Sequence, residues 1–470
     1  GGFESPVSSS SGLSRGARLS FMAACLSCAS FGFDIGSTAC AVRADQALGD
    51  FDLPAESWQQ GLLVTASLYG ATVSSFALFV ANDALGRRQE MIIGNLLFAV
   101  GTAVSALAGG VGMILAGRFF FGLGIGAVMH SAPPFIAETA PAALRGRLIS
   151  LKEAFVVGGA SLGYFTGVAC PFEHGWRYIW AMDFPIAVLA FALSFCCAES
   201  PRWLAAQGRR ERAAESLSFY RGGRVPPGEL RAVLTAGMGA GGEGGAGTES
   251  ARFSLWDLGL YRRSLEVSCG LVLLQQISGQ PSVMYYTPTI FESVGLSGRA
   301  AVAASGVVSL VKTAATGISA AVVDKYGRCP LLMSGTSLMA AALVIMAAAD
   351  VTRSGESHQG NLTLIGLTVF VVGYQVGFGP ISWIMVSEVS PLRARGTLVG
   401  IATTVNFAGN ILAGQLVPVM LGSMRHSVVW LIFLAVTLLS LVFIRYRVPE
   451  TKGRTLEDIE KLMASRPASP

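Results

Sequence analysis

Two residues of opposite charge stand inside long apolar stretches of this sequence. Asp34 lies in the stretch 19–40, and Arg118 lies in the stretch 112–132. A charge inside a lipid-spanning helix costs about 2.5–3.5 kcal/mol on insertion scales, so each charge is expected to have a partner or a function. Both stand six residues from stretch ends that we expect on the same membrane face, about 9 Å deep at 1.5 Å per residue. We therefore expect the side chains to pair, either as a static salt bridge or as a proton switch in which protonation of Asp34 releases Arg118.

The stretches that position these residues are long enough to cross a membrane. Of the 470 residues, 52% are hydrophobic and 13% are charged, whereas soluble domains carry about 25% charged residues. This composition excludes a disordered chain and an ordinary cytosolic enzyme, and the net charge of +5 is too small to indicate a nucleic-acid partner. A membrane helix needs about 20 residues. Twelve apolar stretches satisfy this: 19–40, 60–81, 91–110, 112–132, 148–170, 179–198, 264–291, 301–323, 330–350, 361–386, 396–420 and 428–446.

The distribution of Lys and Arg among the short loops predicts the orientation of these stretches. The loops after the second, fourth, eighth and tenth stretches each carry two basic residues, and the loops on the other side carry one each. We therefore expect the even-numbered loops and both termini on the cytoplasmic side.

Charged motifs at the ends of the stretches recur in the same order at intervals of 241 to 251 residues. The recurring residues are Asp83, Arg87, Glu138, Arg145 and Glu199 with Arg202 in the first half, and Asp324, Arg328, Glu388, Arg395 and Glu450 in the second. Parallel repeats of six spans are the architecture of the major facilitator superfamily. The charges either anchor helix ends at the membrane interface or form cytoplasmic gate ion pairs between the halves when a carrier is open outward. In the second case, breaking a set would favour the opposite state.

Further motifs resemble those of the sugar porters of this superfamily, from about residue 18 to 460. They are Gly86-Arg87-Arg88, Glu199-Ser-Pro-Arg202, Gln275-Gln276-Ile-Ser-Gly279, Asp324…Gly327-Arg328 and Pro449-Glu450-Thr-Lys452-Gly453. Met129-His130-Ser-Ala-Pro133, Ser150-Leu-Lys152-Glu153 and Gly279-Gln280-Pro281-Ser282 are most similar to plant vacuolar glucose transporters and D-xylose–proton symporter-like proteins. The resemblance implies an all-α membrane protein with 12 transmembrane helices in two pseudo-symmetric six-helix bundles.

The resemblance also assigns a role to Asp34 and Arg118, because an acid in Gly32-Phe33-Asp34-Ile-Gly36 marks the proton symporters of the family. We therefore expect a proton-coupled monosaccharide symporter of the glucose or xylose type, working by alternating access. Protons are the coupling ion, and no other cofactor is expected. A facilitative sugar or polyol uniporter is the alternative, and a non-transporting sugar sensor is a third interpretation.

A sugar site made of amide and aromatic side chains is implied in the second half. An amide both donates and accepts hydrogen bonds, as a sugar hydroxyl does, and a Trp offers an apolar face to a sugar ring. The expected substrate-binding residues are Gln275, Gln276, Gln280, Gln375, Trp383 and Asn406. The alternative is that the amides only join neighbouring helices.

Three positions depart from the usual pattern of the family. Glu153 stands where a Gln is common, Lys312 stands where an Asn is common, and Pro281 follows Gln280 where an Asn is common. The first two changes concern charge. Because a carboxylate and an ammonium here replace two neutral amides, we expect them to pair across the cavity and to hold sugar hydroxyls. A structural pair away from the substrate is the alternative. Lys152 is a competing partner for Glu153, although we expect it at the cytoplasmic edge.

The expected domains are a tail (1–17), a first bundle (18–200), a cytoplasmic linker (201–263), a second bundle (264–448) and a cytoplasmic tail (449–470). The linker should contain an amphipathic helix from Trp203 to Tyr220 and a flexible Gly-rich stretch around 237–247.

The sequence contains no catalytic motif and no metal-ligand spacing, so neither an enzyme nor a metal site is expected. His130 is expected to be packed in the core. We expect a monomer in a lipid bilayer whose partners are a monosaccharide and protons. The plasma, vacuolar and plastid membranes are not distinguished.

Overall fold

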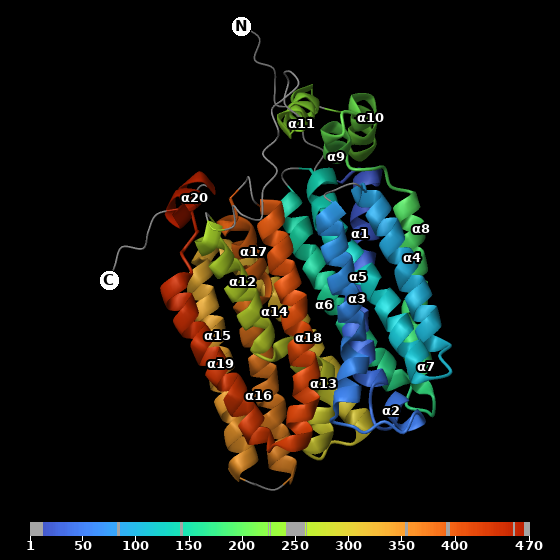
Figure 1. Cartoon of the computed structure of the whole chain (residues 1–470), viewed down its shortest axis with the longest axis vertical. Helices are drawn as coiled ribbons and strands as arrows, with labels where there is room; N and C mark the ends of the chain where they lie inside the picture. The colour runs from blue at the N-terminus through green and yellow to red at the C-terminus, as the bar shows by residue number, and fades with distance from the viewer. Residues whose placement is uncertain are drawn as a thin grey trace.

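The computed structural model describes residues 13–81, 85–141, 144–223, 225, 227–240, 259, 261–352, 356–391, 395–454 and 456–464. Over these residues the chain forms helices and no strands, and the long helices run side by side in two bundles (Figure 1). The first bundle contains α1 (Arg15–Ala41), α3 (Trp58–Ala81), α4 (Arg87–Ala106), α5 (Val111–Thr139), α6 (Arg145–Ala169), α7 (Gly175–Ala181) and α8 (Asp183–Phe195). The second contains α12 (Arg262–Ile277), α13 (Gln280–Ser293), α14 (Gly298–Tyr326), α15 (Arg328–Thr352), α16 (Glu356–Val376), α17 (Phe378–Val389), α18 (Arg395–Ser423) and α19 (His426–Arg447).

The twelve predicted spans all correspond to helical segments. Within the described residues, ten helices are long and apolar enough to cross a membrane, and the other two predicted spans are α6 and the broken pair α12–α13. Helix α12 ends before Gly279, which has a φ of 92°, and Pro281 then lacks an N–H for a continuous helix. The span 361–386 is likewise broken between α16 and α17, at Gly377. Helix α5 continues to Thr139, beyond the predicted end at 132.

The remaining helices define the two ends of the bundles. Helices α9 (Pro201–Ala206), α10 (Arg210–Arg221), α11 (Pro227–Ala240) and α20 (Leu456–Ala464) lie at one end, here called the linker side. The short α2 (Ala47–Asp50) and α7 lie at the opposite end, here called the far side (Figure 1). The predicted helix from Trp203 to Tyr220 is in fact two helices, because Gly208 turns the chain with a φ of 74°. Of the predicted Gly-rich stretch, 237–240 belongs to α11, and the rest lies outside the described residues.

Glycines allow α1 and α6 to pack with their backbones in contact. A Cβ added at Gly32 would lie 1.7 Å from the carbonyl oxygen of Val156, and one added at Gly159 would lie 2.2 Å from that of Ala29. In lipid the hydrophobic effect does not drive helices together, so such close packing of small residues is a main source of association. This seam fixes the position of α1, the helix that carries Asp34.

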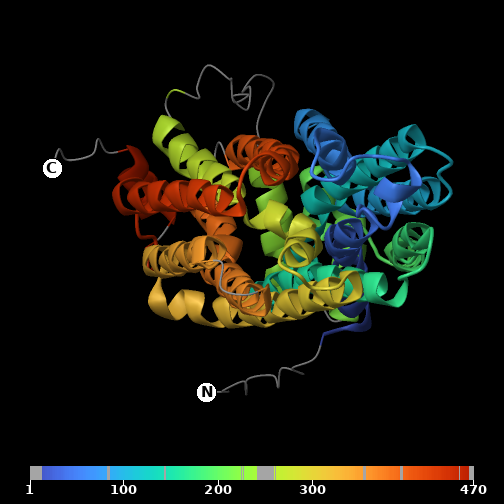
Figure 2. The ribbon, with the colours of Figure 1, turned by 90° about the horizontal axis from the view of Figure 1, so that it is seen from below.

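Three pairs of helices make most of the contact between the two bundles. Helix α3 lies against α18, α6 lies against α14, and α1 lies against α13. Figure 2, viewed from the far side, shows the bundles side by side with α6 and α14 along their common edge. At the far side, Gln415 on α18 donates to Thr65 on α3 at 3.0 Å, and Tyr164 on α6 donates to the carbonyl of Met284 on α13. The bundles are therefore joined at the far side and at mid-depth.

The glycine seam predicts a position-specific loss of stability. Gly32→Ala should destabilise the fold by about 1–3 kcal/mol, because the new methyl group forces α1 away from the backbone of α6. Thermal unfolding of the detergent-solubilised protein measures this. Gly158→Ala on α6 is the matched control, since no atom lies within 4 Å of a Cβ there. Equal melting temperatures for the two variants would contradict the prediction.

Candidate functional site

The ion pair between Asp34 and Arg118 is buried in the first bundle, and the predicted pairing is confirmed. Asp34 on α1 is 3% exposed, and Arg118 on α5 is 2% exposed. The guanidinium contacts both carboxylate oxygens, the second at 3.2 Å, and donates to Ser67 Oγ on α3 at 3.1 Å. Ser67 in turn donates to Asp34 at 3.1 Å, and the ring of Trp180 stacks 5.6 Å from the guanidinium. The helices α1, α3, α5 and α7 therefore meet at this pair.

A second buried acid, Asp183, lies beside this pair and was missed in the sequence. It begins α8, is 2% exposed, and lines a small cavity together with Asp34 and Arg118. Neither of its carboxylate oxygens has a hydrogen-bond partner among the described residues, although the hydroxyls of Ser30 and Thr102 are polar neighbours. Its position inside the predicted span 179–198 was the available signal. The site is therefore a cluster of two carboxyls and one guanidinium.

The amides of the second bundle gather where its helices are broken. Gln275 on α12 donates from Nε2 to the carbonyl of Phe378 at 3.0 Å, at the start of α17. Its Oε1 accepts from Asn406 on α18 at 3.5 Å. Gln275 therefore joins α12 to the start of α17 and to α18.

Other amide atoms in this region have no hydrogen-bond partner among the described residues. They are Gln276 Oε1, Gln280 Nε2, Gln375 Oε1 and Asn410 Oδ1. Asn410 was missed in the sequence, although it stands one helical turn after Asn406 and thus on the same face of α18. A buried amide atom without a partner is costly, so these atoms could bond to a polar ligand. Trp383 on α17 is 37% exposed and leaves its ring accessible.

The expected pair between Glu153 and Lys312 is not formed. Glu153 on α6 pairs instead with its neighbour Lys152, at 2.6 Å between Oε1 and Nζ. Lys152 is only 4% exposed, and its expected place at the cytoplasmic edge stays a prediction. Lys312 on α14 lies with Nζ 6.0 Å from the centre of the Tyr374 ring, within electrostatic range of Glu153. A flexible lysine in the same helix reaches Glu153 without a cross-bundle contact, so Lys152 is its partner.

His130 is not the packed core residue that the sequence predicted. Its Nδ1 lies 2.8 Å from Glu90 Oε2, and the side chain is 32% exposed, whereas Glu90 is 2% exposed. Glu90 stands in the first turn of α4, just outside the predicted span 91–110. The sequence pattern therefore did not predict that this acid is buried.

On the linker side, the described residues of each bundle include an ion pair built from the recurring motifs. Arg87 Nε lies 3.9 Å from Glu138 Oε1 in the first bundle. Arg328 Nη2 lies 2.9 Å from Glu388 Oε1 in the second. Both pairs join residues of the same bundle, so the described residues show no cytoplasmic gate pair between halves in this state.

A glutamate closes the same motif in each bundle by accepting from a helix N-terminus. Glu199 accepts from the backbone N–H of Arg88 at 3.0 Å, and Glu450 accepts from that of Cys329 at 2.8 Å. Burial raises the pKa of Glu199. Burial acts in the same direction on Glu450, but backbone N–H donors outweigh it and leave the pKa of Glu450 lowered. The two carboxylates therefore have equivalent structural roles.

Arg202 is the one remaining predicted gate residue whose side chain lies within the described part of the chain. Arg202 stands exposed at the start of α9. Asp83 lies outside the described residues, and the side chains of Arg145, Asp324 and Arg395 are likewise outside them. Their part in a gate stays a prediction.

Comparison with known proteins gives the same fold and identifies relatives over nearly the whole chain. The sequence profile of the family described as "Sugar (and other) transporter" matches residues 19–463. The D-xylose-proton symporter-like 2 protein of Arabidopsis thaliana is 36% identical, over 92% of this chain and 87% of the relative. The arabinose-proton symporter of Bacillus subtilis (strain 168) is 31% identical, over 86% of this chain and 87% of the relative.

The inward-open structure of the xylose transporter XylE from E. coli superposes with a TM-score of 0.79. It is 24% identical and covers 94% of this chain and 98% of the other. The match supports the fold of two six-helix bundles. The chain belongs to the family described as "Sugar (and other) transporter".

Proposed function

We propose that this chain is a proton-coupled monosaccharide symporter that works by alternating access. The observation that carries the proposal is the buried cluster of Asp34, Arg118 and Asp183 inside a membrane bundle. Ionisable groups at this depth are costly, and in membrane proteins they mark functional sites. Relatives named as D-xylose-proton and arabinose-proton symporters support the transport of a sugar together with protons.

Proton binding acts through a change of partner for Arg118. While Asp34 is ionised, the guanidinium bridges α1, α3 and α5. A proton on Asp34 removes half of this ion pair, and the guanidinium then turns toward Asp183, which lines the same cavity. Because a ligand shifts a two-state equilibrium only through different affinities for the two states, the proton must bind more tightly in one arrangement of α1 and α5.

Sugar binding uses the amides that have no protein partner. Gln276, Gln280, Gln375 and Asn410 each offer a free polar atom, while Trp383 covers an apolar face of the sugar ring. Gln275 and Asn406 are already joined to each other and orient the site. Lys312 from α14 supplies a charged donor on one side, and the Lys152–Glu153 pair places a carboxylate on the other, where charge-assisted bonds to hydroxyls are stronger than neutral ones.

The linker side faces the cytoplasm in this proposal. The support is the excess of Lys and Arg in the loops on that side, as the positive-inside rule expects. Because the bundles are joined at the far side, we assign the structure to a state that is closed on that side. Alternating access then requires the far-side contacts to break while the linker side closes.

Flux measurements on reconstituted vesicles test the function. Labelled glucose or xylose should accumulate inside the vesicles, against its own gradient, when the outside is made more acidic than the inside. Asp34→Asn should abolish this accumulation and leave sugar exchange intact, because the neutral amide resembles the protonated acid and can no longer release a proton. A wild-type protein that equilibrates sugar without moving protons would be a uniporter, and unaltered accumulation in the Asp34→Asn variant would reject the assigned role.

The two adjacent glutamines should behave differently when truncated. Gln276→Leu should weaken sugar binding by about 1–3 kcal/mol, roughly 5- to 150-fold, because a free amide is lost. Gln275→Leu should instead lower the melting temperature, since the carbonyl of Phe378 loses its donor. Isothermal titration with the sugar and thermal unfolding separate the two effects. The assignment is wrong if Gln276→Leu binds the sugar normally.

A further inference from the structure

Among the ion pairs between described residues, one joins the two bundles. Arg43, at the far-side end of α1, contacts the carboxylate of Glu292 in the last turn of α13. The other pairs lie within one bundle or on the linker, including the linker-side pairs of Arg87 and Arg328. The remaining polar contacts between the bundles, such as the one from Gln415 to Thr65, are between uncharged groups. Arg43 and Glu292 are therefore unusual in placing opposite charges on the two bodies that must separate.

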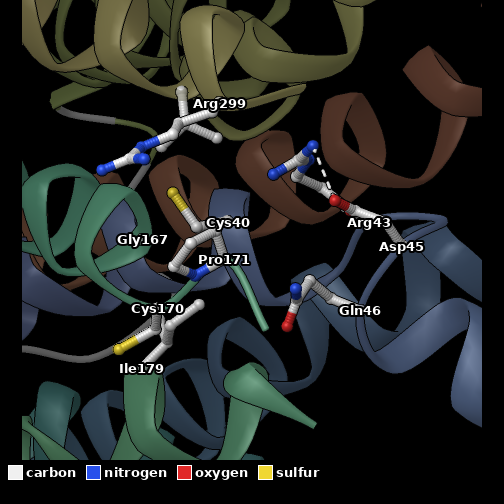
Figure 3. Close-up of a pocket in the computed structure, with 10 residues that line it drawn as sticks. Cys40, Arg43, Asp45, Gln46, Gly167, Cys170, Pro171, Ile179 and Arg299 are labelled. Atoms are coloured by element: carbon white, nitrogen blue, oxygen red, sulfur yellow. Dashed lines mark hydrogen bonds and ion pairs between the residues drawn. The ribbon is translucent and has the colours of Figure 1, made fainter. Parts of the chain in front are cut away.

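The surroundings of Arg43 make this contact more than a surface ion pair. The side chain is 7% exposed, and a Cβ at Gly298, where α14 begins, would lie 2.6 Å from its Nη2. Figure 3 shows Arg43 beside a small cavity, with Arg299 of α14 on the other side of it. The guanidinium is thus enclosed by the second bundle, and the pair is screened less than an exposed one would be.

Arg43 also has a partner that moves with it. Its Nη2 lies 3.2 Å from Asp45, which follows it by two residues in the same bundle (Figure 3). When the bundles separate, Arg43 can keep Asp45 and lose only Glu292. This matters because a buried charge left without any partner is strongly destabilising.

We propose that Arg43 and Glu292 form the far-side gate of the transport cycle, and that Asp45 retains Arg43 while the gate is open. This inference rests on the proposed alternating access but concerns residues outside the proton and sugar sites. The pair stabilises the closed far side relative to the open one. Asp45 opposes it, because it competes for the same nitrogen and lowers the cost of opening.

The two carboxylates therefore have opposite effects on one equilibrium. Removing Glu292 should favour the open far side. Removing Asp45 should favour the closed one, because Glu292 is then the one carboxylate partner left to Arg43 among its described contacts. A general loss of stability would shift both variants in the same direction.

Distances between the bundles measure this equilibrium directly. Spin labels attached through bio-orthogonal amino acids at Ala55 and Met424 report the far-side distance, since both residues are exposed there on opposite bundles. In nanodiscs, Glu292→Gln should raise the ratio of open to closed far side roughly tenfold. Asp45→Asn, the matched control, should not raise it. Glu292→Asp, which keeps the charge on a shorter side chain, should give a smaller shift and serves if the Gln variant does not fold.

The result has two clear ways to contradict the proposal. An unchanged distance distribution in Glu292→Gln would overturn it, and so would an equal shift to the open state in Asp45→Asn. The measurement needs neither sugar nor a pH gradient. Absence of sugar flux in a protein that still shows both distances would therefore count against the proposed function and not against the gate.

Discussion

The ion pair of Asp34 with Arg118 constrains the whole first bundle, because charges in lipid must be neutralised at short range. The guanidinium reaches Asp34 and Ser67 together only if α1, α3 and α5 approach closely. Gly122 permits this on one side, since a Cβ there would lie 1.9 Å from the carbonyl of Ser67. The glycine seam between α1 and α6 holds the other side. Small residues are therefore a structural condition for the charge cluster.

The repeated motifs give the bundles the same frame but not the same chemistry. Glu199 and Glu450 occupy equivalent positions at helix N-termini, and each bundle closes its own Arg–Glu pair. The titratable cluster lies in the first bundle, whereas the free amides lie in the second. In the proposed mechanism, this division places the proton site in the first bundle and the sugar site in the second. Neither ligand alone then determines the relative position of the bundles.

Depth and pattern predicted the frame, but they could not predict which of several neighbours a flexible side chain would choose. The pairing of Asp34 followed from equal depths in two helices, which rigid helix geometry preserves. The partner of Glu153 did not, because Lys152 and Lys312 were both in reach and only coordinates show which one bends toward it. Asp183 was readable as an acid inside a span, yet its proximity to Asp34 depends on how α8 packs against α1.

Coupling between the two sites must pass through elements that contact both, and α6 meets this condition. It packs along α1, which carries Asp34, and its Ser161 lies 2.9 Å from Ser309 of α14, the helix that carries Lys312. The same helix carries Glu153, whose side chain is 40% exposed. A displacement of α1 caused by protonation of Asp34 therefore moves the backbone of α6, because the glycine seam leaves no space for α1 to move alone. In the proposed mechanism, the seam that stabilises the fold thus also connects the proton-binding carboxylate to the proposed sugar site.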